Sequence, residues 1–108
     1  MPYFVLHALD RPDAAADRAR LRAAHRAYIR QPHPDCRCVL GGPLEDETGA
    51  MTGSMLVVEA SDQQAAARFF AGDPYASAGL YAERRLHPWR WGLGRTPGDD
   101  LPLTQDAP

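Results

Sequence analysis

The order of strand-like and helix-like segments is the feature that most restricts how this chain can fold. Two alanine-rich segments show the spacing of amphipathic helices, at residues 13–31 and 61–73. Around them lie four segments of strand-forming residues, at 3–10, 36–46, 51–60 and 80–93. The resulting order, β-α-β-β-α-β, is typical of an α+β, ferredoxin-like (split βαβ) fold, in which helices cover one side of an antiparallel sheet.

This order also predicts one domain with an uncovered sheet face. We expect residues 1–94 to form the domain, and the Pro-, Gly- and Asp-rich residues 95–108 to form a loose tail. Both faces of the strand at 3–10 carry mostly apolar side chains, so the face without helices would be apolar. Two such sheets packed in a symmetric pair would cover this surface, and we therefore predict a homodimer formed through the sheet face.

Composition and charge exclude several classes of partner. The formal net charge is −2 and 44% of the residues are hydrophobic, so nothing draws the whole chain toward nucleic acid or an anionic membrane. No apolar run approaches the roughly 20 residues that cross a bilayer. The first residues lack the basic segment and the cleavage site of a signal peptide. The expected location is the cytoplasm.

Motifs for cofactors and metals are missing from the sequence. It contains no GxGxxG, no GxxxxGK[ST] and no HExxH, so we expect no cofactor and no metal. Cys36 and Cys38 would lie on one face of a strand, where a disulfide would be strained. Together with His33 they would supply only three zinc ligands. The simplest interpretation is a pair of small, partly buried thiols in a reducing compartment.

A histidine and an aspartate remain as candidate acid–base residues. Asp73 precedes Pro74 at the start of a short helical turn, and His25 lies beside the expected apolar stripe of the first helix, Leu21, Ala24, Tyr28 and Ile29. A carboxylate that orients an imidazole fixes its tautomer and raises its basicity, so the two could form a catalytic pair. The residues alone leave simpler interpretations open, with His25 as a boundary residue and Asp73 as a helix N-cap; Asp13 is the expected cap of the first helix.

Arginines accompany His25 on one side of the first helix. Arg18, Arg22 and His25 are spaced i, i+4 and i+7, so they share a side. Such a group could bind an anionic or phenolic oxygen near the histidine. A solvated basic stripe has the same spacing, and the sequence leaves both interpretations open.

The other histidines and the tryptophans have weaker claims to a functional role. His7 alternates with apolar residues on the first strand, so it could face the space between paired sheets and any pocket there. His33 and His87 are interpreted as structural. The tryptophans of "WRW" (89–91) would share one strand face and are expected to pack in the core or an interface. Pro88 indicates an edge position or a bulge.

Several segments together resemble the YCII-related (YciI-like) family. They are "YFVLHALDRPDA", "RARLRAAHRAYI", "LGGPLEDETGAMTGSMLVVEA", "GDPYASAGLY" and "HPWRW". The resemblance implies a ferredoxin-like α+β fold that dimerises through its sheets, and an active site built around a histidine and an aspartate. The matching positions here are His25 and Asp73. It further implies a link to a dehydrochlorinase of the same superfamily, which acts on a chlorinated hydroxyquinol, although most members have no assigned reaction.

Residues and resemblance together favour a small cofactor-free lyase. His25 would be the general base, Asp73 would orient it, and Arg22 and Arg18 would hold the developing oxyanion of a small phenolic or aromatic molecule. The pocket would lie between helices and sheet or at the dimer seam, and its wall would include Gly42, Pro43, Ser54 and His7. The alternative is a dimeric module that binds such a ligand without turning it over.

Overall fold

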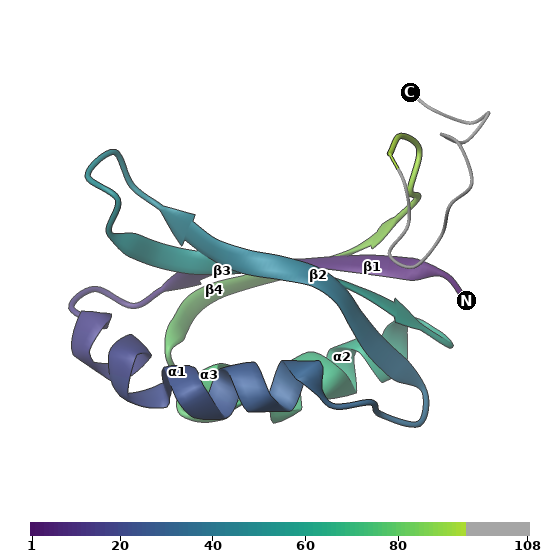
Figure 1. Ribbon diagram of the computed structural model, residues 1–108, viewed down its shortest axis with the longest axis horizontal. Helices are drawn as coiled ribbons and strands as arrows, with labels where there is room; N and C mark the ends of the chain where they lie inside the picture. Colours follow the sequence, from purple (N-terminus) through teal and green to yellow (C-terminus); the bar gives the residue numbers. More distant parts are fainter. Residues whose placement is uncertain (95–108) are drawn as a thin grey trace.

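Four segments of strand-forming residues form a single antiparallel sheet (Figure 1). The computed structural model describes residues 1–94, and the predicted tail at 95–108 lies outside them. The strands are β1 (Tyr3–Asp10), β2 (Cys36–Glu45), β3 (Met51–Ala60) and β4 (Tyr81–Trp89), in the spatial order β2-β3-β1-β4. This arrangement confirms the predicted ferredoxin-like α+β fold, and β4 lies at an edge, as Pro88 indicates.

The helices all cover the same face of the sheet (Figure 1). They are α1 (Ala15–Arg30), α2 (Gln63–Gly72) and α3 (Pro74–Ser77), and the side chains of Asp62 and Asp73 cap α2 and α3. The expected cap of α1 by Asp13 is wrong. The cap position is Ala14, whose side chain cannot accept a hydrogen bond, and the backbone of Asp13 before it is left-handed, with φ 59°. Within residues 1–94, no helix is both long and apolar enough to span a bilayer.

The hydrophobic core lies between the sheet and α2. β1 and β3 turn alternate side chains toward the helices, where they pack against one face of α2. The core residues that these three elements contribute are Phe4, Leu6, Ala8, Leu56, Val58, Ala60, Ala65, Ala66, Phe69 and Phe70. Because α2 supplies most of the apolar surface on the helical side, it anchors the helical layer to the sheet.

α1 packs on the sheet with a different kind of surface. Its two buried side chains are Arg18 and His25, while Tyr28 and Ile29 are half-buried. The expected apolar stripe is wrong at Ala24, which is exposed because the helix turns Arg18 and His25 toward the sheet in its place. A guanidinium or imidazole is costly to bury unless it is paired. The partners of these two residues therefore determine how α1 is held.

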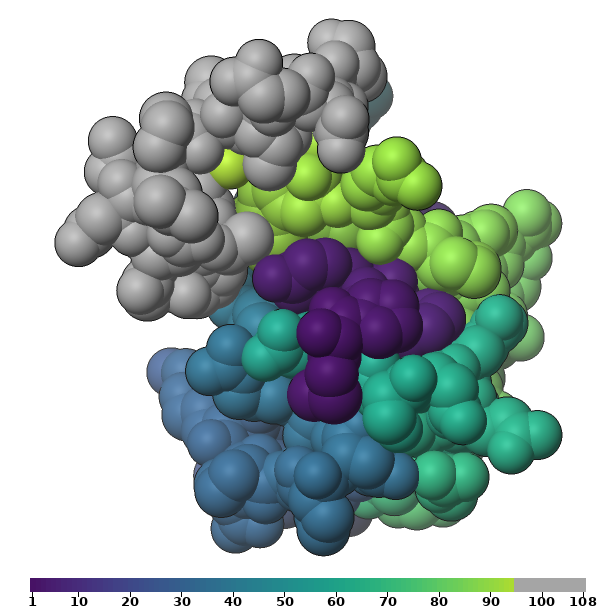
Figure 2. All heavy atoms as spheres, turned by 90° about the vertical axis from the view of Figure 1, so that its right-hand side faces the viewer, coloured from purple at the N-terminus to yellow at the C-terminus, as the bar shows by residue number. Residues whose placement is uncertain are grey.

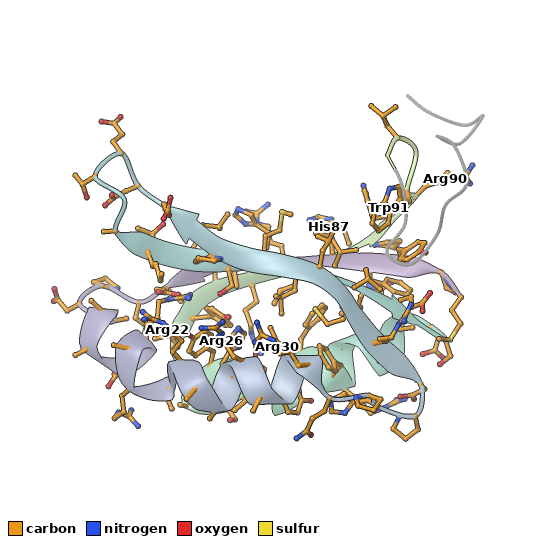
Figure 3. The ribbon with its side chains drawn as sticks, in the orientation of Figure 1. Arg22, Arg26, Arg30, His87, Arg90 and Trp91 are labelled. Carbon is orange, nitrogen blue, oxygen red and sulfur yellow. The ribbon has the colours of Figure 1, made fainter. Side chains whose placement is uncertain are left out.

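The sheet face away from the helices carries exposed apolar and aromatic side chains. They include Leu40, Met55 and Trp89, each 39% exposed. Figure 3 shows His87 and Trp91 on this side. Trp91 lies beyond the end of β4, so the two tryptophans do not share a strand as expected, although their rings are 5.2 Å apart. Figure 2 shows the start of β1 (purple) beside the end of β4 (yellow-green). At this corner the ring of Tyr3 packs against the rings of Trp89 and Trp91, and the three form an aromatic cluster.

Candidate active site

His25 and Asp73 meet beneath the sheet although 48 residues separate them in sequence. α1 points His25 toward the sheet, and the junction of α2 and α3 places Asp73 against it. Nδ1 of His25 lies 2.8 Å from both Oδ1 and Oδ2 of Asp73. Oδ1 also accepts a hydrogen bond of 3.0 Å from the backbone N–H of Tyr75. One buried carboxylate therefore caps α3 and holds the imidazole at the same time.

The contacts of His25 define which ring nitrogen is free. An ionised carboxylate only accepts hydrogen bonds, so we assign the hydrogen to Nδ1 and the lone pair to Nε2. Within residues 1–94, Nε2 has no hydrogen-bond partner. Every fully buried side-chain nitrogen or oxygen in this part of the chain has such a partner, so Nε2 is not fully buried. Nε2 therefore opens into the adjoining cavity. The ring of Tyr75 stacks on the imidazole at a centroid distance of 3.9 Å, which fixes its orientation.

Arg18 is buried in a second polar cluster beside His25. Its guanidinium donates hydrogen bonds of 2.7 and 2.8 Å to Asp10 and one of 2.9 Å to Oγ of Ser54. Its Cζ also lies 4.6 Å from the ring centroid of Tyr75. Burial lowers the pKa of Arg18, but the hydrogen bonds and charge of Asp10 outweigh it and raise the pKa above its usual value. Because Asp10 already neutralises Arg18, this arginine is better suited to holding neighbouring groups than to attracting an anion.

Ser54 connects this cluster to the edge strand β4. The hydroxyl of Tyr81 donates a hydrogen bond of 2.9 Å to Oγ of Ser54. Burial raises the pKa of Tyr81 to about 12, and the hydrogen bond to Ser54 offsets part of this rise. The phenol of Tyr81 therefore stays protonated at neutral pH. Arg18 and Tyr81 together fix the position of the Ser54 hydroxyl on the cavity wall.

A cavity of about 280 Å³ lies between α1 and the sheet. From α1 it is lined by Arg18, Arg22, His25, Arg26, Ile29 and Arg30. From the sheet it is lined by Gly41, Gly42, Pro43, Met51, Ser54 and Leu56, and Tyr75 completes the lining. Its volume is close to the lower end of the range for small-molecule sites, roughly 300 Å³. The cavity therefore suits a ligand about as large as one substituted ring.

The structure brings most of the predicted site residues to this cavity. Among them, Arg18, Arg22, His25, Gly42, Pro43 and Ser54 line it. Asp73 lies behind His25 and reaches the cavity only through it. His7 is not brought there. Strand alternation turns its neighbours Leu6 and Ala8 inward, so His7 is exposed on the opposite face of the sheet.

Sequence reasoning misses four residues that the structure places at the site. Asp10 looks like part of a turn, and Tyr75 follows a cap, so neither position indicates that it holds Arg18 or His25. Arg26 and Arg30 continue the four-residue spacing of Arg18 and Arg22, and that repeat is the signal that could have identified them. Figure 3 shows Arg22, Arg26 and Arg30 in the space between α1 and the sheet.

The described residues supply acid–base groups rather than metal ligands. Within residues 1–94, no group of three His, Cys, Asp or Glu side chains could hold a metal ion. Cys36 and Cys38 are free thiols. Burial raises their pKa values to about 12 and about 11, so the thiolate form that metals prefer is disfavoured at neutral pH.

Known proteins share this sequence and architecture over most of the chain. Residues 1–90 match the YCII-related domain. An uncharacterized protein of Haemophilus influenzae is 32% identical over 94 residues, covering 82% of this chain and 96% of that protein. Protein YciI of Escherichia coli is 30% identical over 93 residues, with coverages of 81% and 95%. The 5-chloro-2-hydroxyhydroquinone dehydrochlorinase TftG of Burkholderia phenoliruptrix, solved in complex with 2,5-dihydroxybenzoquinone, is 30% identical, with a TM-score of 0.72 and coverages of 83% and 95%.

Proposed function

The chain belongs to the YCII-related domain family, and from this premise we propose that it is a cofactor-free acid–base lyase acting on a small phenolic or enolic molecule. One observation carries the proposal: Asp73 holds Nδ1 of His25 while Nε2 opens into a cavity of about 280 Å³. Such a nitrogen can act as a general base and return the proton as a general acid. The dehydrochlorinase TftG, which is similar to this chain, supports elimination from a hydroxylated ring as the type of reaction.

Proton transfer through His25 is sufficient for such an elimination. Nε2 takes the proton of one ring hydroxyl and returns it to the ring carbon that bears the leaving group, which gives a ketone. Nε2 then takes the proton of a second hydroxyl, whose bonding pair forms a new carbonyl while the leaving group departs with its own pair. The net change is loss of one proton and one anion from the substrate. Asp73 stabilises the imidazolium that forms in each step.

Arg22 is the residue best suited to stabilise the oxyanion that forms when the hydroxyl is deprotonated. It lies one turn before His25 on the same side of α1 and lines the cavity. Within residues 1–94 its guanidinium has no acidic partner, and it contacts Sδ of Met51 at 3.6 Å. Its charge is therefore available to a ligand, in contrast to that of Arg18.

The test is turnover of halogenated hydroquinones, followed by halide release and by absorbance of the quinone product. We expect His25→Ala to abolish turnover and Asp73→Asn to lower it by about 10²-fold or more. Arg20→Gln removes a charge from the solvent side of the same helix and should leave turnover unchanged. Undiminished turnover in His25→Ala would refute the mechanism. A wild-type protein that binds these compounds without releasing halide would support the non-catalytic binding module in its place.

We also propose that two copies pair through the sheet face that the helices leave uncovered. Large apolar side chains are exposed on that face, among them Leu40 and Met55. An exposed apolar surface of this kind is usually covered by another chain. In analytical ultracentrifugation at micromolar concentration we expect a dimer, and a monomer for Met55→Glu. A stable wild-type monomer would refute the pairing.

A further inference from the structure

A row of arginines runs along the cavity side of α1. Arg18, Arg22, Arg26 and Arg30 follow one another every four residues, a rise of about 6 Å per step along the helix. All four line the cavity (Figure 3 labels the last three). Arg18 is buried against Asp10, whereas the other three are exposed. The row therefore starts with a neutralised arginine and continues with three exposed ones, with His25 between the second and the third arginine of the row.

The outer three arginines carry charge that the described residues do not neutralise. Within residues 1–94, no acidic side chain pairs with Arg22, Arg26 or Arg30. Their guanidinium groups make only weak neutral contacts there: Nη1 of Arg30 donates to the backbone oxygen of Arg26, and Nη2 of Arg22 donates to Sδ of Met51. Among residues 1–94, no Asp or Glu lines the cavity. Like charges four residues apart repel each other, so this arrangement slightly destabilises α1.

Positive charge is concentrated at this cavity. The whole chain has a formal net charge of −2, so the row does not reflect a generally basic protein. Arg11, Arg20, Arg37 and Arg68 each contact an acidic side chain within 4.0 Å, whereas Arg84, Arg85 and Arg90 have no such ion pair within residues 1–94 but lie away from the cavity lining. Unpaired guanidinium groups that converge on one cavity attract anions, and their planar fork matches the oxygens of a carboxylate.

The other side of the cavity indicates what else the anion carries. Ile29, Pro43, Met51 and Leu56 provide apolar surface next to the arginines. The side chain of Leu56 packs directly against Gly41, where a Cβ atom would collide with it. An inorganic anion would leave this surface in contact with water, whereas an organic acid would cover it.

We infer that Arg26 and Arg30 bind a carboxylate carried by the substrate. This inference rests on the proposed function in one respect, namely that the same cavity receives the substrate. The phenolic or enolic part of the molecule would lie at His25 and Arg22, and its carboxylate would lie beside Arg26 and Arg30. The substrate class is then a small hydroxylated acid rather than a neutral phenol.

Binding of two probes that differ only in a carboxylate tests this inference. The probes are 2,5-dihydroxybenzoate and hydroquinone, titrated calorimetrically into the full chain. We expect the benzoate to bind about tenfold or more tightly than hydroquinone, which is the scale of one hydrogen bond to a charged group. Arg26→Gln/Arg30→Gln should remove this preference and its dependence on salt. The matched control, Arg20→Gln, should keep both, and thermal unfolding would verify that each variant is folded.

The outcomes separate this inference from the proposed function. His25→Gln should lose turnover but keep the preference for the carboxylate. The binding measurement therefore remains informative even if the wild-type protein has no lyase activity. Equal affinity for the two probes, or no binding of either, would overturn the inference. It would also be overturned if Arg20→Gln weakened binding as much as the double variant, or if inorganic phosphate displaced the benzoate at a lower concentration than benzoate itself requires.

Discussion

Asp73→Asn separates the two roles of one carboxylate. In the wild type, Oδ1 caps Tyr75 and both oxygens contact Nδ1 of His25. An asparagine can keep the cap only with its carbonyl oxygen at the Oδ1 position, because its NH₂ group cannot accept a hydrogen bond. The NH₂ group then occupies the Oδ2 position, 2.8 Å from Nδ1 in the wild type. The carbonyl oxygen would also lie 2.8 Å from Nδ1, but an Nδ1 hydrogen would then face the amide hydrogens, so we expect the NH₂ group to donate to Nδ1 and the imidazole hydrogen to move to Nε2.

The expected loss of stability is small for asparagine and larger for alanine. Asn and Asp are equivalent N-caps, so Asp73→Asn replaces a charge-assisted hydrogen bond by a neutral one and loses about 1 kcal/mol of unfolding free energy. Asp73→Ala removes the cap, worth about 1 kcal/mol, and leaves the buried Nδ1–H of His25 unpaired, for a total of about 3 kcal/mol. In a domain of this size these losses correspond to about 5 °C and about 15 °C in Tm.

Two measurements test this reasoning without a substrate. Urea unfolding gives the two stability losses, and ¹⁵N NMR above the ordinary pKa range of histidine gives the tautomer of His25. We expect hydrogen on Nδ1 in the wild type and on Nε2 in Asp73→Asn. The geometric explanation is refuted if the asparagine variant keeps hydrogen on Nδ1, or if alanine and asparagine destabilise the chain equally.

Three further predictions follow from the buried groups around the cavity and in β2. Arg18→Met should cost about 3–5 kcal/mol of unfolding free energy because it leaves Asp10 unpaired, and Arg18→Met/Asp10→Asn should recover part of it in urea titrations. Tyr81→Phe should remove a phenol that ionises near pH 12 in absorbance titrations near 295 nm. Because the pKa of Tyr81 is raised in the folded chain, its contribution to stability is fully present below about pH 10 and disappears as the pH rises through 12. At pH 8, Cys36 and Cys38 should react with Ellman's reagent much more slowly in the folded chain than in urea, and fast labelling of both would contradict their raised pKa values.

The apolar part of the fold can be predicted from the sequence because its signals are local. Alternation marks the strands, and the apolar spacing of Ala66, Phe69 and Phe70 identifies the buried face of α2. The buried face of α1 cannot be predicted in the same way. It consists of Arg18 and His25, whose burial depends on partners elsewhere in the chain, and periodicity of apolar residues indicates Ala24 instead.

The site was predictable where helical spacing, side-chain chemistry or the resemblance pointed to its residues. The "DPY" segment identifies Asp73 as a cap by local rules, and its chemistry makes a pair with His25 possible, but only the resemblance favours that pair over the simpler interpretations. The role of Asp10 could not be found, because turn chemistry explains an aspartate before "RP" equally well. Arg26 and Arg30 look like solvated charges until the position of β2 shows that they line a cavity.

The polar interface of α1 is better explained by chemistry than by stability. Apolar side chains in place of a buried ion pair are often neutral or stabilising, so a helix held only for its packing would not need Arg18 against Asp10 or His25 against Asp73. These pairs do achieve what an apolar interface cannot: they fix one tautomer of an imidazole beside a cavity lined with guanidinium groups. α2 provides the apolar anchor, and α1 is therefore free to present polar groups at defined positions.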